Sequence, residues 1–139
     1  MGLGKEFYLG GHAIFTVISV DTQERSTFKI EKVEFNDRPG TFFFVHVLTG
    51  PDNTSDYSYL GKVDRTSGQL KFTQKTPAGA EHSPRWKRLQ AALDLAWGNP
   101  PEDRVVAMHE GKCARCGRML TDPESIERGI GPVCMELNK

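Results

Sequence analysis

Thr41-Phe42-Phe43-Phe44-Val45-His46-Val47-Leu48 is the most apolar run in the chain, and we take it as the stretch that decides the fold. Phenylalanine and valine favour strands, and Asp37-Arg38-Pro39-Gly40 just before the run is a typical turn sequence. Side chains alternate between two faces along a strand, and here both faces are apolar. The run therefore predicts a central strand, over residues 41–48, that is covered on both sides.

Further strands are predicted on either side of this run. Residues 13–20 are rich in β-branched side chains, and residues 27–35 alternate polar with apolar, with a phase slip at Lys32 that indicates a bulge. Residues 57–63 and 69–73 flank Asp64-Arg65-Thr66-Ser67-Gly68, which is the pattern of a hairpin. We therefore expect a mostly antiparallel sheet of about five strands.

The sequence period changes after the connector that ends at His82. Ser83 suits an N-cap, Pro84 suits the first helical position, and Gly98 before Asn99-Pro100-Pro101 suits a helix end. The apolar side chains recur on one helical face, formed by Trp86, Leu89, Leu93, Ala96 and Trp97. We expect a helix over residues 84–97 that covers the sheet. Three basic residues off this stripe should form a solvent-facing cluster: Arg85, Lys87 and Arg88.

The three cysteines lie near the end of the chain, as Cys113, Cys116 and Cys134. A CxxC turn supplies two thiolates from one loop, and the seventeen residues before Cys134 leave room for a short helix to go out and return. The capping box Thr121-Asp122-Pro123-Glu124 predicts that helix. His109 follows a short apolar strand over residues 105–108 and would complete a tetrahedral Cys3His zinc site.

Energetics favour the same interpretation. The tail has few aliphatic side chains, and chains below about 40 residues usually need a disulfide or a bound metal to fold. Structural zinc supplies roughly 10 kcal/mol of apparent folding free energy in small fingers. His12, His46, His82 or a water are alternatives to His109 as the fourth ligand.

Two other functions of the cysteines compete with a structural zinc site. A redox CxxC would sit in a thioredoxin-like βαβ unit, which the pattern lacks, and a catalytic Cys134 with His109 as base would need an oxyanion hole. Four protein ligands would close the zinc site to hydrolytic chemistry. Since no spaced carboxylate pair or Ser/His/Asp set stands out either, we expect a non-enzymatic protein.

Composition limits the architecture and the partners. The chain has 139 residues, enough for one β-rich domain over residues 1–104 with a zinc knuckle over residues 105–139. Its 18 Lys and Arg balance its 18 Asp and Glu, so nucleic-acid binding would depend on a local patch. No apolar run is long enough to span a membrane, and an odd cysteine count argues against a disulfide framework. We expect a cytoplasmic protein that does not bind membranes.

The tail also resembles a known family. The segments that carry the resemblance are His109-Glu110-Gly111-Lys112-Cys113-Ala114-Arg115-Cys116-Gly117-Arg118, Leu120-Thr121, Pro123-Glu124-Ser125-Ile126 and Gly129-Ile130-Gly131-Pro132-Val133-Cys134. They are similar to a small cysteine-rich domain of unknown function that recurs in bacteriophage and prophage proteins. The resemblance covers about the last thirty residues. It implies a phage or mobile-element origin and zinc on the three cysteines, and it implies no reaction.

Two functions follow as expectations. The first is a non-enzymatic, phage-type zinc protein that binds nucleic acid or a nucleoprotein complex in the bacterial host cell, because zinc knuckles bind single strands. Its candidate contacts are Arg85, Lys87, Arg88, Lys112, Arg115 and Arg118. The alternative is a phage protein that binds and inhibits a host defence or replication factor through exposed aromatic residues. Tyr57 and Tyr59 share a strand face and are either a stacking platform or ordinary packing residues.

Overall fold

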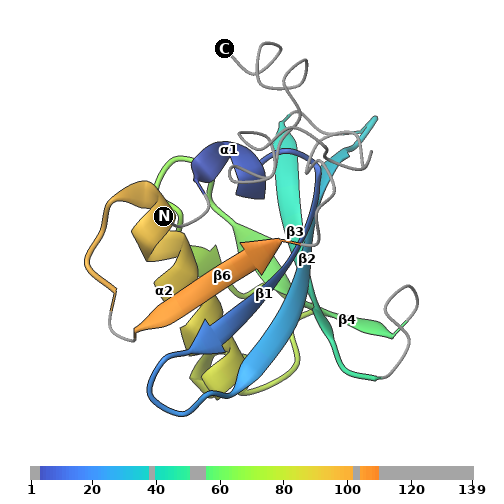
Figure 1. Cartoon of the computed structure of the whole chain (residues 1–139). Coiled ribbons are helices and arrows are strands. Elements are labelled where there is room, and N and C mark those ends of the chain that lie inside the picture. Colours follow the sequence, from blue (N-terminus) through green and yellow to red (C-terminus); the bar gives the residue numbers. More distant parts are fainter. Residues whose placement is uncertain (1–3, 38–39, 51–55, 102–103, 110–139) are drawn as a thin grey trace.

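The computed structural model describes residues 4–37, 40–50, 56–101 and 104–109 (Figure 1). The helices in this part of the chain are α1 (Lys5–Tyr8), the 3-10 turn η1 (Ala80–His82) and α2 (Pro84–Trp97). The strands are β1 (His12–Ser19), β2 (Arg25–Glu34), β3 (Thr41–Leu48), β4 (Tyr57–Val63), β5 (Leu70–Lys71) and β6 (Val105–His109).

Within the described ranges, six strands form one sheet in the order β5-β4-β3-β2-β1-β6. Every neighbouring pair is antiparallel. β1 to β5 follow one another as a meander, and the chain then passes through α2 before β6 returns to pair with β1. The predicted α+β class and the mostly antiparallel sheet are confirmed, and the strand that leads to His109 belongs to that same sheet.

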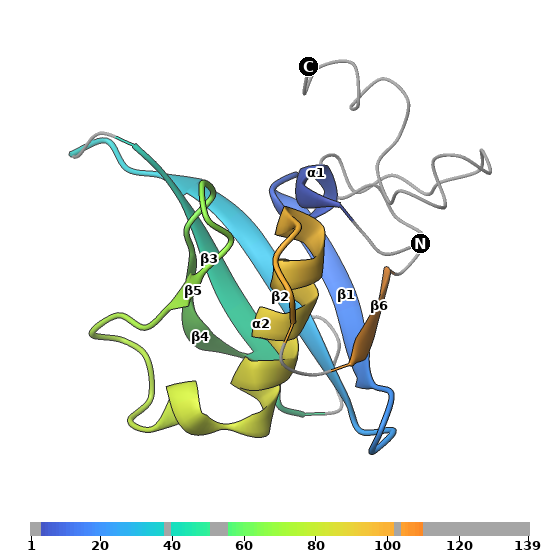
Figure 2. The ribbon, with the colours of Figure 1, turned by 90° about the vertical axis from the view of Figure 1, so that its left-hand side faces the viewer.

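The helix α2 covers one face of the sheet, which curves around it (Figure 2). The predicted helix over residues 84–97 is confirmed to the residue: Ser83 Oγ accepts a hydrogen bond from the Trp86 amide at 3.3 Å, and Gly98 ends the helix with a φ of 79°. The core under α2 is built from the apolar stripe of the helix and from alternate residues of the strands. Its largest fully buried side chains are Tyr8, Phe7, Phe15, Phe28, Ile30, Leu89, Leu93, Val17 and Val45.

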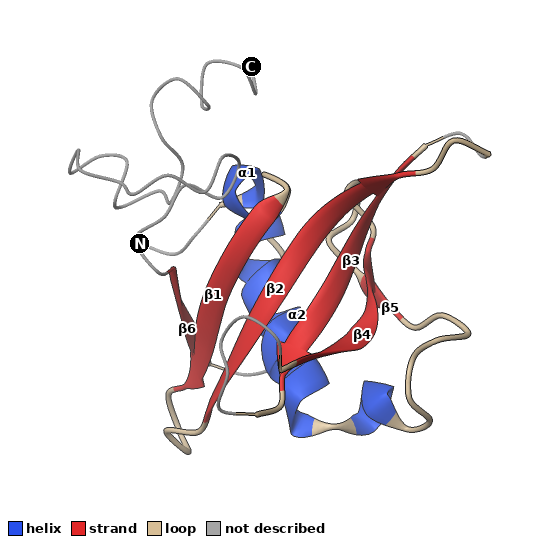
Figure 3. Cartoon of the chain, turned by 90° about the vertical axis from the view of Figure 1, so that its right-hand side faces the viewer, coloured by secondary structure: helices blue, strands red, loops and turns tan. Residues whose placement is uncertain are grey.

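Within the described residues, no helix or second sheet covers the other face of the sheet, contrary to the prediction that β3 is covered on both sides. Phe43, Val45 and Val47 are buried under α2, whereas Phe42 and Phe44 are only half-buried. Figure 3 looks onto this second face and shows α2 behind the sheet. We call it the open face; Ile14, Lys29, His46 and Tyr59 lie side by side across it on four strands. The prediction was wrong because a row of large aromatic side chains has the same sequence pattern whether or not another layer covers it.

The strand register corrects a second prediction. No bulge interrupts β2 at Lys32, which pairs with Phe43 in continuous register. The shift lies between Val45 and His46, which pair with Gly61 and Tyr59, so Leu60 is the extra residue on β4. A bulge of this kind bends the strand and increases its twist, in keeping with the curvature of the sheet.

The sequence patterns did not predict α1. Phe7 and Tyr8 of this single turn are almost fully buried, and both rings pack edge-on against Phe15 of β1. Burial raises the pKa of the Tyr8 hydroxyl. Four residues are too few for a helical period to show in the sequence. Among the described helices, none is both long and apolar enough to cross a membrane.

Candidate functional site

The predicted zinc site falls largely outside the described residues. Cys113, Cys116 and Cys134 lie there, as do the candidate contacts Lys112, Arg115 and Arg118 and the short helix expected after Thr121. In the part of the chain that the structure describes, no three His, Cys, Asp or Glu side chains gather as a metal site. The whole zinc site, with His109 as its fourth ligand, therefore remains a prediction.

His109 is described, at the end of β6. It pairs with Phe15 of β1, is half-buried, and has its ring centroid 5.9 Å from that of Phe7. The alternative fourth ligands lie on other elements: His12 begins β1, His46 lies in the middle of β3, and His82 ends η1. His109 is thus the histidine closest in sequence to the cysteines, and it is the residue at which β6 ends and the cysteine-containing tail begins.

The basic cluster on α2 is only partly as predicted. Arg85 and Lys87 are exposed, but Arg88 is buried, with 8% of its surface exposed. Its guanidinium donates from Nη2 to Ser26 Oγ at 2.9 Å and from Nη1 to Glu24 Oε2 at 3.2 Å. Arg88 therefore ties α2 to the start of β2 and is not a surface contact.

A sequence signal for the burial of Arg88 exists in hindsight. Ala91 and Ala92 stand three and four residues after it, and both are 2% exposed. Residues at these spacings share one helix face, so two adjacent alanines widen the buried stripe towards position 88. The stripe of large side chains, taken alone, places Arg88 on the solvent side.

The open face carries a continuous set of rings, which we call the aromatic row: Phe35, Phe42, Phe44, Tyr59 and His46. Phe42 and Phe44 lie parallel with centroids 6.0 Å apart, and Phe35 is 5.6 Å from Phe42. Tyr59 joins Phe44 at 5.9 Å and His46 at 5.6 Å. The row thus runs along β3 and crosses to β4, with its rings half-buried or, for Phe35, 37% exposed.

The tyrosines of β4 do share the open face, as their sequence spacing indicated. Tyr57 pairs with Leu48 and Tyr59 pairs with His46. The Lys29 ammonium lies 4.7 Å from the centroid of the Tyr57 ring, in a cation–π arrangement. The Tyr59 hydroxyl is within hydrogen-bonding distance of Thr73 Oγ1, at 2.9 Å. These contacts hold both rings in place, and both side chains are half-buried.

Charges on the open face are mixed, with more cations than carboxylates around the aromatic row. Lys29 forms an ion pair with Glu31 at 2.9 Å, and Lys62 lies next to Phe44 in the strand register. Burial lowers the pKa of His46, an effect that Glu31 opposes and Lys29 reinforces. His46 is therefore neutral at physiological pH, and the row is an uncharged aromatic surface flanked by lysines.

A cavity of about 350 Å³ opens at one end of the aromatic row, where β3 begins and β4 ends. Phe42 of the row forms part of its wall, and the remaining lining is mostly polar. The polar lining residues are Thr41, Lys62, Asp64, Arg65, Thr66 and Lys71.

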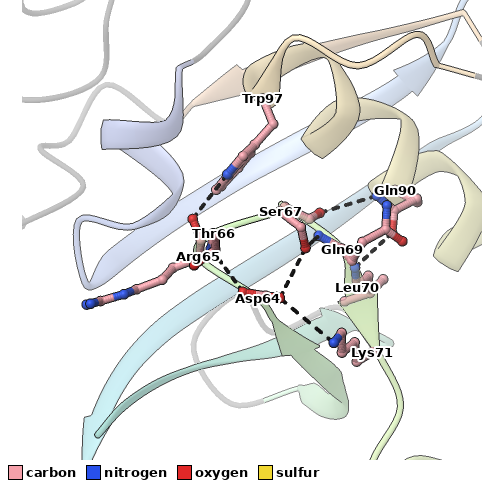
Figure 4. Close-up of polar contacts among 10 residues, drawn as sticks. Asp64, Arg65, Thr66, Ser67, Gln69, Leu70, Lys71, Gln90 and Trp97 are labelled. Carbon is pink, nitrogen blue, oxygen red and sulfur yellow. Dashed lines mark hydrogen bonds and ion pairs between the residues drawn. The ribbon is translucent and has the colours of Figure 1, made fainter.

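The turn between β4 and β5, which forms one wall of the cavity, is held by its own hydrogen bonds (Figure 4). Asp64 accepts from the Thr66 amide at 2.9 Å and from Ser67 Oγ at 3.1 Å, and its carboxylate is 3.8 Å from Lys71 Nζ. The bond from the Thr66 amide is the main reason that the pKa of Asp64 is lowered. Asp64 is therefore ionised and already engaged by these three groups.

The same turn is fastened to α2 (Figure 4). Trp97 Nε1 donates to the Arg65 carbonyl at 3.1 Å, and Gln90 both accepts from the Leu70 amide at 2.8 Å and donates to the Gly68 carbonyl at 3.3 Å. Gly68 has a φ of 74°, and a Cβ there would lie 2.6 Å from the Trp97 ring. The wall of the cavity thus depends on the helix on the other side of the sheet.

Comparison with known proteins adds one finding. Residues 103–138 match a family of unknown function, DUF6011. The match covers the cysteine-containing tail and β6, and it agrees with the resemblance of this tail to a domain of unknown function. Neither the curated proteins nor the solved structures contain a match to the chain.

Proposed function

We propose that this chain is a non-enzymatic protein that binds single-stranded nucleic acid on its open face. The observation that carries the proposal is the aromatic row, a connected set of rings on a sheet face that α2 leaves uncovered. Bases stack on aromatic side chains with little dependence on sequence, and a sheet is a common platform for such stacking.

Local charge supports this use of the open face. The whole chain has a formal net charge of zero, so affinity for phosphates has to arise locally. Lys29, Lys62 and Lys71 all project from the same face as the aromatic row, because Lys29 pairs with His46, and Lys62 with both Phe44 and Lys71. Arg85 and Lys87 start a helix on the opposite side of the sheet and would not contact the same strand.

In this proposal the cysteine-containing tail contributes a zinc site and further basic residues. Cys113, Cys116, Cys134 and His109 would hold one zinc ion, which would fold the tail next to the end of β6. The basic residues Lys112, Arg115 and Arg118 would then lie near the metal and add phosphate contacts. A phage or mobile-element origin, which the resemblance of the tail implies, is part of the same proposal.

Fluorescence anisotropy with labelled oligonucleotides tests the function. The full zinc-loaded chain should bind single-stranded DNA or RNA more tightly than a duplex of the same sequence, because paired bases cannot stack on the rings. Affinity should fall as salt rises. Equal affinity for single strand and duplex would refute stacking on the aromatic row, and absence of binding at low salt would refute the function.

A protein partner is the second candidate, favoured by a different part of the open face. Val106 and Met108 of the edge strand β6 are 50% and 48% exposed and extend the apolar surface beyond β1. Exposed apolar residues of this kind are typical of protein contacts. A phage protein that inhibits a host defence or replication factor would use this region. Met108→Lys should abolish capture of such a partner from host lysate while oligonucleotide binding persists; retained capture would exclude this surface.

A further inference from the structure

The cavity at the end of the aromatic row has an excess of positive charge. Lys62, Arg65 and Lys71 contribute three cations to its lining, against the single carboxylate of Asp64. Within the described residues, Lys71 forms an ion pair with Asp64, whereas neither Lys62 nor Arg65 has an ion-pair partner. Figure 4 shows the Arg65 side chain directed away from Asp64. Two cations are therefore available to an anion, and a metal cation would be repelled.

The remaining lining also fits an oxyanion. Thr41 and Thr66 are among the lining residues, and threonine hydroxyls are donors to phosphate oxygens in nucleic-acid complexes. Asp64 does not oppose this, because its oxygens already accept from the Thr66 amide and Ser67 and lie beside Lys71. The lining thus combines three cationic side chains with one carboxylate whose charge is already compensated.

The volume of the cavity and its position beside the aromatic row limit the kind of ligand that it can bind. The volume of about 350 Å³ lies at the lower end of the range of small-molecule pockets, about 300–1,000 Å³, and suits a unit of nucleotide size. Phe42 belongs both to the cavity wall and to the aromatic row, where its ring is parallel to that of Phe44. A nucleotide with its base on Phe42 would therefore have its phosphate within reach of the cavity cations.

We infer that the cavity formed by the start of β3, the end of β4 and the β4–β5 turn binds one phosphate group of a nucleic-acid strand whose adjacent base stacks on Phe42. Lys62 and Arg65 supply the charge, and Thr41 and Thr66 supply hydroxyl donors. This inference rests on the proposed function and specifies it further: the cavity marks the point at which the strand backbone is anchored, and the aromatic row gives the direction in which its bases extend.

The dependence of affinity on salt tests the inference. Loss of one phosphate contact to a single strand reduces the slope of log K against log salt by about 0.7. The full chain and its Lys62→Gln variant are titrated with a single-stranded oligonucleotide at several salt concentrations. Lys62→Gln should reduce the slope by that amount, and Phe42→Leu should weaken binding with the slope unchanged. Lys87→Gln is the matched control, because Lys87 is an exposed lysine on α2, behind the sheet.

The results separate this inference from the proposed function. If single strands bind and the Lys62→Gln variant shows the same slope of log K against log salt as the wild type, the proposed function stands and the phosphate site is wrong. If no oligonucleotide binds, the function fails, and the site is tested with inorganic phosphate alone by NMR titration of the full chain. Saturable shifts of the Lys62, Arg65 and Thr66 amides that vanish in Lys62→Gln would then support an anion site for free phosphate; no shifts would overturn it.

Discussion

Replacement of Gly68 by alanine should destabilise the protein by about 2–5 kcal/mol, a sum of two terms. A left-handed residue with a side chain costs about 1–2 kcal/mol, and Gly68 has a φ of 74°. The new Cβ would also lie 2.6 Å from the Trp97 ring, and overpacking of this kind costs about 1–3 kcal/mol. The ring would have to move, which would weaken its hydrogen bond to the Arg65 carbonyl.

Gly79 provides the matched control. Its φ of 80° is close to that of Gly68, but a Cβ there meets no atom within 4 Å. Gly79→Ala should therefore cost only the backbone term of about 1–2 kcal/mol. The free energies of unfolding are measured by urea titration, followed by circular dichroism and by tryptophan fluorescence. Equal losses in the two variants would refute the claim that Trp97 holds the β4–β5 turn, and an unchanged Gly68→Ala protein would refute the conformation of the turn itself.

Three further predictions concern the core, the open face and the tail. Arg88→Ala should cost about 1.5–3 kcal/mol in urea titrations, since it removes charged hydrogen bonds to Ser26 and Glu24, whereas the exposed Lys87→Ala should stay within about 0.5 kcal/mol of the wild type. Because the pKa of His46 is lowered from its usual 6.5, the unfolded chain takes up a proton more readily than the folded chain, and the free energy of unfolding should fall as pH drops below about 6.5. His46→Gln should flatten that part of the plot of unfolding free energy against pH. An unchanged plot in this variant would contradict the burial of the ring. Native mass spectrometry should find one zinc ion in the wild type and none in Cys116→Ser, and a metal-free mass for both would overturn the zinc site.

Element boundaries were predictable where several local signals agree. α2 begins and ends as predicted because Ser83 caps it, Pro84 fits its first turn, and Gly98 takes the left-handed conformation after it. β3 and β4 match their predicted ranges because turn residues bracket runs of β-branched and aromatic side chains. These are short-range effects that a sequence expresses directly.

The features that depend on packing were not predictable. Whether β3 is covered on one face or two depends on how many layers the chain supplies, and the burial of Arg88 depends on how α2 sits over β2. The aromatic row depends on register: the extra residue Leu60 decides that Tyr59 faces His46, and the turn after β2 brings Phe35 back against Phe42. One shifted residue would reverse the faces, so these contacts follow from the sheet and not from any single stretch.

The lysines of the open face could not be recognised from charge patterns in the sequence. Charge patterns in the sequence pointed to the start of α2 and to the tail, and of the α2 residues Arg85 and Lys87 remain exposed. Lys29, Lys62 and Lys71 are far apart along the chain and stand among apolar or polar neighbours, so none forms a basic run. Only the pairing of β2 through β5 places them on one face with the rings.

The most direct test of the account compares two phenylalanine variants in one oligonucleotide titration. Phe44→Ala removes the ring at the centre of the aromatic row, whereas Phe72→Ala removes a ring that is 66% exposed and has no place in the row. Stacking of one base is worth about 1–3 kcal/mol, so Phe44→Ala should weaken binding of a single strand about 5- to 150-fold, and Phe72→Ala should leave it unchanged. Equal affinity of the wild type and a folded Phe44→Ala protein would contradict the central claim that the open face binds the strand.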